Sequence, residues 1–342
     1  PYIQTVKPKS VLCMPLLNQG ILTGILYLEN NLTNHAFTKD RLDLLNLLSA
    51  QIVIAIDNAR LYSNMKKLSE SYERFVPREF LRLLEKKSIT DVALGDQIQK
   101  DISVMFCDLR NYTAISENMT PQETFSFINH FFNIMEPIIN QHHGFIDKYI
   151  GDAIMALYPT SADDALNSAL AMLLALQKFN AMRISTEQEP IHIGIGLNTG
   201  LSILGTVGDA HRMEGTVISD AVNIASRVQN LTKIYKVPLL ITEHTYKKLS
   251  NPYDHHIRKI GNVLVKGKKI AVSLYEVFDN NPLSIAKLKK EYAATFQQGV
   301  AYYENKDYKN AADIFRDISI KNKQDYPAIY YLKRCERKRG LS

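Results

Sequence analysis

Two aspartates lie at the ends of apolar runs that are typical of β-strands. Asp108 follows the run ISVMFC, and Asp152 lies in the turn of the segment GFIDKYIGDAIMALY. Because a helical segment joins the two runs, we expect their strands to be neighbours in one sheet. Two such carboxylates can hold a pair of hard divalent cations, which prefer oxygen ligands and leave room for substrate phosphates. A single aspartate in such a place is more often a turn residue, so the prediction of chemistry at phosphorus depends on the motifs that follow.

The composition of the 342 residues is ordinary for a globular protein, with 46% hydrophobic and 22% charged residues, and the length suits two or three domains. The net charge of +6 suits an anionic substrate, and no run of five basic residues indicates a nucleic acid partner. The three cysteines lack CxxC spacing, which argues against zinc or disulfides and favours a reducing, cytoplasmic compartment. No signal peptide and no apolar stretch near ~20 residues is evident, so we expect no membrane contact. The chain lacks an initiator Met, and we expect it to be a fragment of a longer protein.

The first 60 residues begin with two predicted strands around the turn Asn18-Gln19-Gly20, and a helix follows from Lys39. The segments CMPLLNQGILTGILYLEN and AFTKDRLDLLNLLSAQIVIAIDNARLY resemble the C-terminal half of a GAF domain, a small-molecule sensor module of the α/β class. We therefore predict that residues 1–60 are the C-terminal part of a GAF domain. The front half of the module, with part of its usual ligand pocket, is absent, so no ligand is assigned.

The helix from Lys39 runs far beyond this module. Its apolar residues step by three and four, as in a coiled coil, at Leu45, Leu48, Ile52, Ala55, Ala59 and Tyr62. We interpret this seam as the contact of a parallel homodimer of signalling helices, and the alternative is a single helix packed on its own domain. Pro77 ends the helix, and residues 61–98 are predicted to be signalling helix and linker.

Residues 99–280 alternate predicted strands and helices, which indicates an α+β domain with helices packed on a mixed sheet. A capping box from Thr120 to Glu123 predicts the start of one helix, and its inward face is expected to carry Phe125, Ile128, Phe132, Met135 and Ile139. Further helices are expected from Ser161 and Asp220. The runs HIGIGLN and SILGTVG are expected to form a hairpin that turns at Thr199-Gly200, and a last hairpin ends in LYEVF.

The C-terminal segment, residues 283–342, is predicted to be an α-helical hairpin. Gly299, Tyr302, Ala311 and Phe315 have the spacing of a tetratricopeptide repeat of roughly 34 residues. A TPR-like tail predicts a protein partner. The alternative is a plain helical hairpin packed on the preceding domain, since one repeat is too few for a solenoid.

Five ordered motifs in the central domain resemble the catalytic domain of class III adenylyl and guanylyl cyclases, with its ferredoxin-like or palm-like fold. They are VMFCDLRNYT, DKYIGDAIMA, GIGLNTG, EGTVISDAVNIASRVQ and VLVKGK. The resemblance implies that Asp108, Asp152 and the Leu109 carbonyl hold two divalent cations, Mg²⁺ or Mn²⁺. Backbone N–H groups are then expected to hold the substrate phosphates, from Leu109, Arg110, Asn111, Tyr112 and Thr113. In-line attack of the ribose 3′-hydroxyl on the α-phosphorus gives a 3′,5′-cyclic nucleotide and pyrophosphate.

The resemblance also assigns roles to three residues further along the chain. Arg227 would stabilise the developing phosphoryl charge, Asn223 would position the ribose, and Lys266 would bind the terminal phosphates. In the family each site is shared between two chains. Asp108 and Asp152 of one chain would therefore face Asn223, Arg227 and Lys266 of the other chain across a homodimer interface.

The resemblance also implies that two positions, Lys148 and Thr216, select the base. Lys148 can only donate hydrogen bonds, so it fits the adenine N1 acceptor and opposes the guanine N1–H. Thr216 offers a hydroxyl that can accept from adenine N6, as in a bacterial and soluble-type subgroup, some members of which respond to bicarbonate. ATP is therefore the expected substrate. The alternatives are a guanylyl cyclase and a non-enzymatic regulatory or scaffold subunit.

Overall fold

The structure is a computed structural model, and it describes residues 2–72, 76–117, 119–209, 211–264 and 271–340. The chain forms two compact units, residues 1–76 and residues 77–342. Lys266 lies outside the described residues, so its predicted role stays a prediction.

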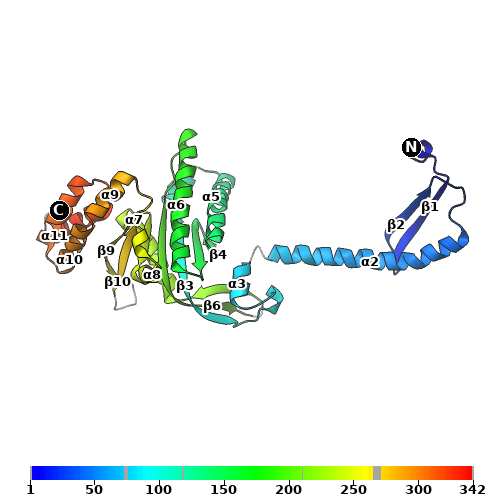
Figure 1. Ribbon diagram of the computed structural model, residues 1–342, viewed down its shortest axis with the longest axis horizontal. Helices are drawn as coiled ribbons and strands as arrows, with labels where there is room; N and C mark the ends of the chain where they lie inside the picture. The colour runs from blue at the N-terminus through cyan, green and yellow to red at the C-terminus, as the bar shows by residue number, and fades with distance from the viewer. Residues whose placement is uncertain (1, 73–75, 118, 210, 265–270, 341–342) are drawn as a thin grey trace. The chain divides into compact units, whose positions relative to one another are not determined.

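The first unit is a β-hairpin with one long helix (Figure 1). Its elements are α1 (Tyr2–Val6), β1 (Ser10–Asn18), β2 (Ile21–Asn30) and α2 (Lys39–Tyr72). Gln19 and Gly20 have φ values of 48° and 85°, which are the positive angles that a two-residue hairpin turn needs. The predicted hairpin is therefore confirmed. Val53 on α2 is buried, and Asn18 Nδ2 donates to Asp57 Oδ2 over 2.6 Å.

The predicted seam on α2 is largely exposed in the single chain. Leu45 and Ile52 are half-buried, whereas the other four seam residues are exposed, up to 75% for Tyr62. An exposed apolar stripe suits a partner helix, but the single chain does not test that pairing, so the homodimer stays a prediction.

Within the described ranges, α2 is also long and apolar enough, by length and composition, to cross a membrane. The expectation that no stretch comes near this length was therefore wrong. Length and composition are the only properties behind this finding, so the absence of membrane contact stays a prediction.

The second unit is built on a mixed sheet with the strand order β4-β5-β3-β6-β8-β10-β9, and β7 pairs with β6 outside this path. The pairs are antiparallel except for β6 and β8, which are parallel. The strands are β3 (Gln97–Leu109), β4 (Phe145–Ile150), β5 (Ala153–Tyr158), β6 (Ile193–Gly208), β7 (Met213–Ile218), β8 (Leu239–Thr242), β9 (Ile257–Leu264) and β10 (Ala271–Val277). The predicted α+β class and the neighbouring strands of Asp108 and Asp152 are thereby confirmed.

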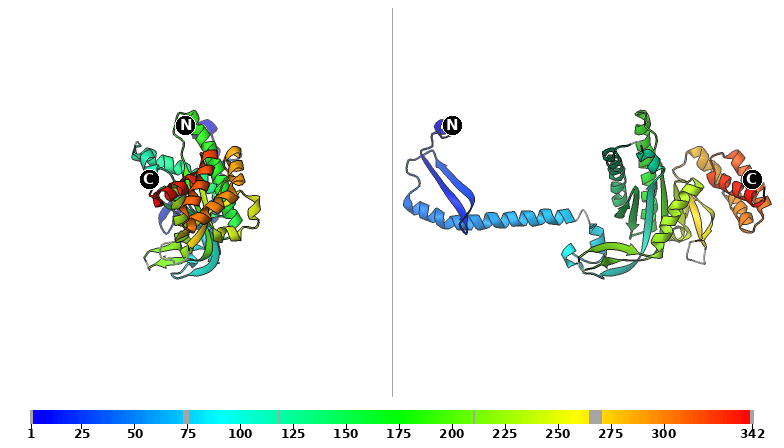
Figure 2. Two further views of the ribbon diagram at one scale, coloured as in Figure 1. Left: turned by 90° about the vertical axis from the view of Figure 1, so that its left-hand side faces the viewer. Right: turned by 180° about the vertical axis from the view of Figure 1, so that it is seen from behind.

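Helices cover both faces of this sheet (Figures 1 and 2). The long helices α5 (Pro121–Gln141) and α6 (Ala162–Ser185) pack on one face. The helix α7 (Asp220–Tyr235) and the tail helices pack on the other. Short helices complete the unit: α3 (Arg78–Leu83), α4 (Tyr112–Ser116) and α8 (Glu243–Lys248).

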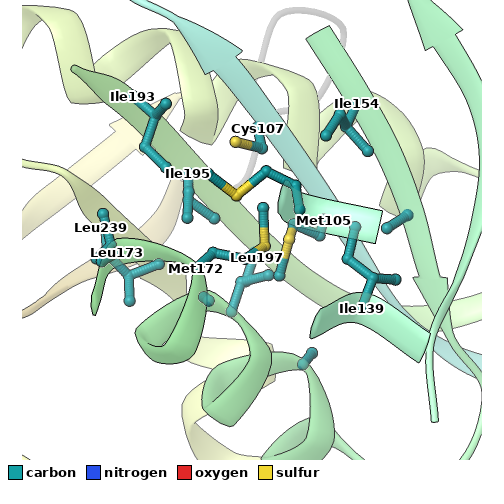
Figure 3. Close-up of a cluster of buried hydrophobic side chains, with 14 of the residues drawn as sticks. Met105, Cys107, Ile139, Ile154, Met172, Leu173, Ile193, Ile195, Leu197 and Leu239 are labelled. Carbon is teal, nitrogen blue, oxygen red and sulfur yellow. The ribbon is translucent and has the colours of Figure 1, made fainter. Parts of the chain in front are cut away.

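The core under α5 and α6 fixes the end of β3. Figure 3 shows side chains from several elements converging there, among them Met105 and Cys107 from β3, Ile139 from α5 and Met172 from α6. Successive residues of a strand point to opposite faces. Because Cys107 is buried under α6, Asp108 projects from the opposite face, toward α7.

The predicted hairpin at Thr199-Gly200 is wrong, because β6 continues through both residues. Thr199 pairs with Ser103 and Gly200 with Ile102 along β3, and the hydroxyls of Ser103 and Thr199 lie 2.7 Å apart. The 13-residue strand β3 supplies a partner along this whole stretch, so the local turn preference of Thr-Gly is overridden. Gly200 is instead a place of close approach, since a Cβ there would lie 3.2 Å from the Cβ of Ala221 on α7.

The predicted helix starts are confirmed. Thr120 and Glu123 form the capping box of α5, and Ser161 and Ser219 cap α6 and α7. The inward face of α5 differs from the expected one, because Phe125 is 70% exposed. The buried row of α5 is Phe131, Met135 and Ile139, and Phe125 lies about 80° around the helix from the centre of this row.

The tail is larger than the predicted hairpin. Four helices form it: α9 (Leu283–Glu291), α10 (Ala293–Glu304), α11 (Tyr308–Lys321) and α12 (Tyr326–Lys338). Gly299 allows α10 and α11 to approach, because a Cβ there would lie 2.9 Å from Phe315 Cζ. Phe296, Phe315 and Tyr331 share one apolar cluster with α7 and β9. The tail therefore packs on the sheet unit, as in the second interpretation given above.

Candidate active site

Asp108 and Asp152 line one cavity of about 1100 Å³. Asp108 stands at the end of β3 opposite Ala153 of β5, and Asp152 directly precedes Ala153. The tight turn between β4 and β5 uses Gly151 at a φ of 63°, a conformation that favours glycine. The strand pairing thus brings the two predicted metal ligands together.

The two carboxylates repel each other unless a cation lies between them. Burial raises the pKa of Asp152 to about 6, and the hydrogen bond and the charge of Asp108 act in the same direction. Lys233 of α7 places its Nζ 2.6 Å from Asp108 Oδ2, so an ammonium lies where a cation is favoured. This electrostatic arrangement fits divalent cations.

The donor set fits hard cations in particular. Among the described residues no group of three His, Cys, Asp or Glu side chains could hold a metal alone. Mg²⁺ is commonly bound by one or two carboxylates together with substrate phosphates, and Asp108 and Asp152 provide that pair. The side chain of Leu109 is buried in the core, so its backbone is the part that lines the cavity beside Asp108.

The predicted phosphate-binding segment also lines this cavity, with one correction. Asn111 adopts a left-handed φ of 56° directly before α4, and Asn111, Tyr112 and Thr113 all face the cavity. The N–H of Arg110 donates to His192 O over 2.8 Å, which continues the contact between β3 and β6. That N–H is therefore not available to a phosphate, and the predicted set shrinks to its other members.

The Arg110 side chain has a structural contact that the sequence did not predict. Its guanidinium donates to the carbonyl oxygens of Ile193, Thr232 and Val237. Burial lowers the pKa of Arg110, and the charge of Asp108 opposes that effect. The three hydrogen bonds fix the end of α7 beside the cavity.

Two residues of α7 that were not predicted contact Asp108. Gln229 Nε2 donates to Asp108 Oδ2 over 3.2 Å, and Lys233 forms the ion pair described above. Gly196 permits this contact, because a Cβ there would lie 2.6 Å from the Cα of Gln229. The spacing of four between Gln229 and Lys233, which places both on one helix face, is the sequence signal that could have found them.

The two predicted base-selecting residues are also neighbours. Lys148 Nζ donates to Thr216 Oγ1 over 3.2 Å and to Glu214 Oε1 over 2.6 Å, and Asp147 lies 3.6 Å away. Burial alone would lower the pKa of Lys148, but the hydrogen bond to Glu214 and the two carboxylate charges outweigh it and raise that pKa. Lys148 therefore remains a pure donor. Glu214, two residues before Thr216 on β7, was missed.

Asn223 and Arg227 lie on a different face of α7 from Gln229 and Lys233. Asn223 is exposed and Arg227 is half-buried. Residues two apart in a helix project about 200° apart, so Arg227 and Gln229 point in nearly opposite directions. The cavity of Asp108 is not lined by the described residues Lys148, Thr216, Asn223 and Arg227. One chain thus gathers the predicted metal and phosphate groups in one place and the predicted base and ribose groups elsewhere.

Known protein families and proteins resemble this chain in sequence. A family model for the adenylate and guanylate cyclase catalytic domain matches residues 95–277, and a GAF domain model matches residues 1–56. The chain is 43% identical over 222 residues to a protein named adenylate cyclase from Anabaena cylindrica, covering 63% of this chain and 44% of that protein. It is 36% identical over 275 residues to a terminal-differentiation specific adenylate cyclase from Dictyostelium discoideum, covering 79% of this chain and 13% of that protein. The chain thus spans less than half the length of either relative.

The fold has a counterpart among solved structures. A bacterial light-regulated adenylyl cyclase superposes with a TM-score of 0.58 at 23% identity, and the match covers 80% of each chain. At 23% identity this structural similarity supports the assignment of the fold alone.

Proposed function

The chain belongs to the family of adenylate and guanylate cyclase catalytic domains, and from that premise we propose that it converts ATP into 3′,5′-cyclic AMP and pyrophosphate. The observation that carries the choice of ATP is the contact of Lys148 with Thr216. It places a donor and an acceptor side by side, which matches the N1 and N6 edge of adenine. The names of the two relatives compared above support the same substrate.

Asp108 and Asp152 would hold two divalent cations, Mg²⁺ or Mn²⁺, with the Leu109 carbonyl. When bound, such ions would favour ionisation of the ribose 3′-hydroxyl and neutralise the departing pyrophosphate. The backbone at Asn111, Tyr112 and Thr113 would orient the phosphate oxygens.

The remaining roles are carried over from the family motif. Arg227 would stabilise charge on the transferring phosphoryl group, Asn223 would hold the ribose, and Lys266 would bind the terminal phosphates. Lys148 and Thr216 would read the adenine. The Lys/Thr pair also supports membership of the subgroup in which some cyclases respond to bicarbonate.

The active sites are proposed to be shared between two copies of the chain. Within one chain the metal groups and the base-reading groups do not line a common cavity, so a second copy is needed to complete each site. A two-fold interface would give two equivalent sites, and the exposed seam of α2 would hold the chains parallel. We place this homodimer in the cytoplasm, without a nucleic acid partner. A protein partner for the tail remains part of the proposal.

The test is an assay of purified chain with Mn²⁺ and either ATP or GTP, with the product identified by chromatography. We expect cyclic AMP from ATP, and the Asp152→Ala variant serves as an inactive control. Cyclic GMP as the main product would replace the proposal by a guanylyl cyclase. If neither nucleotide is converted although both bind, the chain is a regulatory or scaffold subunit.

A further inference from the structure

The tail contributes a side chain to the active-site cavity. Tyr326, at the start of α12, lines the same cavity as Asp108 and Asp152. Its neighbour Asp325 caps α12 and accepts two hydrogen bonds of 2.7 Å from the buried guanidinium of Arg258 on β9. The charged pair joins the start of α12 to the sheet, so the position of Tyr326 is fixed relative to the cavity.

Tyr326 faces a lysine with an unusual backbone. Lys236 Nζ lies 5.5 Å from the centre of the Tyr326 ring, which is cation–π distance. Lys236 itself follows α7 with φ 53° and ψ 43°, a left-handed conformation that is normally left to glycine or asparagine. On either side of it, the carbonyls of Thr232 and Val237 accept hydrogen bonds from Arg110.

The charges around the cavity suit an anion once cations are present. Lys233, Lys236 and Arg110 line it together with Asp108, Asp152 and Glu117. The three carboxylates balance the three basic side chains. Two divalent cations would therefore leave a surplus of positive charge, which favours a polyphosphate.

We propose that Lys236 is a further phosphate-binding residue of the cyclase site, and that Tyr326 of the tail is the positioning residue that holds its ammonium at the cavity. The ligand class is the linear polyphosphate of the nucleotide or the pyrophosphate product. This inference rests on the proposed function only in naming that nucleotide as the source of the polyphosphate. It also gives the tail a role at the active site of its own chain.

Binding of inorganic tripolyphosphate, measured by calorimetry at fixed Mg²⁺ with the whole chain, tests the proposal without any turnover. Lys236→Asn removes the charge and keeps a residue that tolerates the left-handed backbone. We expect about fivefold weaker binding, because two charges about 4 Å apart in water interact by about 1 kcal/mol. Tyr326→Leu should weaken binding by about two- to fivefold, in line with an exposed cation–π contact, whereas Tyr326→Phe keeps the ring and should bind like the unchanged chain.

The chain offers a matched control. Lys321 Nζ lies 5.1 Å from the ring centre of Tyr292, in the tail and away from the cavity lining. Lys321→Asn should leave tripolyphosphate binding unchanged. Equal binding by Lys236→Asn and Lys321→Asn would overturn the proposal, and so would an equal loss in Tyr326→Phe and Tyr326→Leu.

The two proposals can fail separately. If the unchanged chain makes no cyclic nucleotide but Lys236→Asn still weakens tripolyphosphate binding, the phosphate-binding role stands and the cyclase assignment fails. If cyclic AMP forms but Lys236→Asn binds tripolyphosphate normally, the cyclase assignment stands and the role of Lys236 is wrong.

Discussion

A buried network of four charges attaches the tail to the sheet. Arg258 donates to Glu276 over 2.8 Å and to both oxygens of Asp325, and Lys289 pairs with Glu276. All four side chains are at most 5% exposed. Burial by itself raises the pKa of Glu276, but the charges of Arg258 and Lys289 outweigh it and lower that pKa. The two positive and two negative side chains therefore neutralise each other in a place that water does not reach.

Replacing Asp325 by Ala breaks this balance. Two buried cations would then share the single carboxylate of Glu276, and breaking a buried pair in this way costs about 3–5 kcal/mol. Asp307 provides the matched control, because it caps α11 through Asn310 N at 3.2 Å and takes no part in the network. Asp307→Ala should cost only about 1 kcal/mol, the value of a lost cap.

Hydrogen exchange of the α12 backbone amides measures the local free energy of opening. We expect exchange to accelerate by about a hundredfold or more in Asp325→Ala, since each 1.4 kcal/mol is a factor of about ten. A second variant, Arg258→Met with Asp325→Leu, should restore much of the protection, because apolar residues often replace a buried ion pair at little cost. If Asp325→Ala and Asp307→Ala accelerate α12 exchange equally, the network does not hold the tail.

Three further predictions concern the sheet unit. Asp147 is 2% exposed, and burial raises its pKa from 3.8 to about 6. The folded state therefore holds this proton more tightly than the unfolded state, and the free energy of unfolding falls as pH rises from about 4 to about 6. In urea unfolding at pH 7, Asp147→Asn should raise the free energy of unfolding by about 3 kcal/mol. An equal increase at pH 4 would refute this. Asp108→Ala and Arg227→Ala chains, each inactive alone, should regain activity when co-expressed, and inactive mixed dimers would place each site within one chain. Lys148→Glu with Thr216→Cys should lower ATP turnover by several powers of ten relative to GTP turnover, and unchanged ATP turnover would remove Lys148 from the base site.

The sequence was sufficient where a feature depends on neighbours along the chain. Asp108 and Asp152 could be predicted because each lies in a short motif that resembles the cyclase family, at the end of one strand and in the turn before another. The cap at Thr120 needs only the residue three positions later. The continuous course of β6 could not be predicted, because Thr199 is held extended by Ser103, almost a hundred residues earlier. The hydrogen bonds of the Arg110 side chain could not be predicted for the same reason, because its three carbonyl acceptors lie far later in the sequence.

The two faces of helix α7 support a site that is shared between two chains. Its residues Gln229 and Lys233 contact Asp108, while Arg227 projects about 200° from Gln229. A single helix thus serves the metal half of one site with one face and, in the proposed dimer, the ribose half of the other site with its opposite face. The tail packs on this helix through Tyr331, whose ring lies 6.3 Å from that of Tyr235. A displacement of the tail would therefore reach both half-sites of the proposed dimer through the same helix.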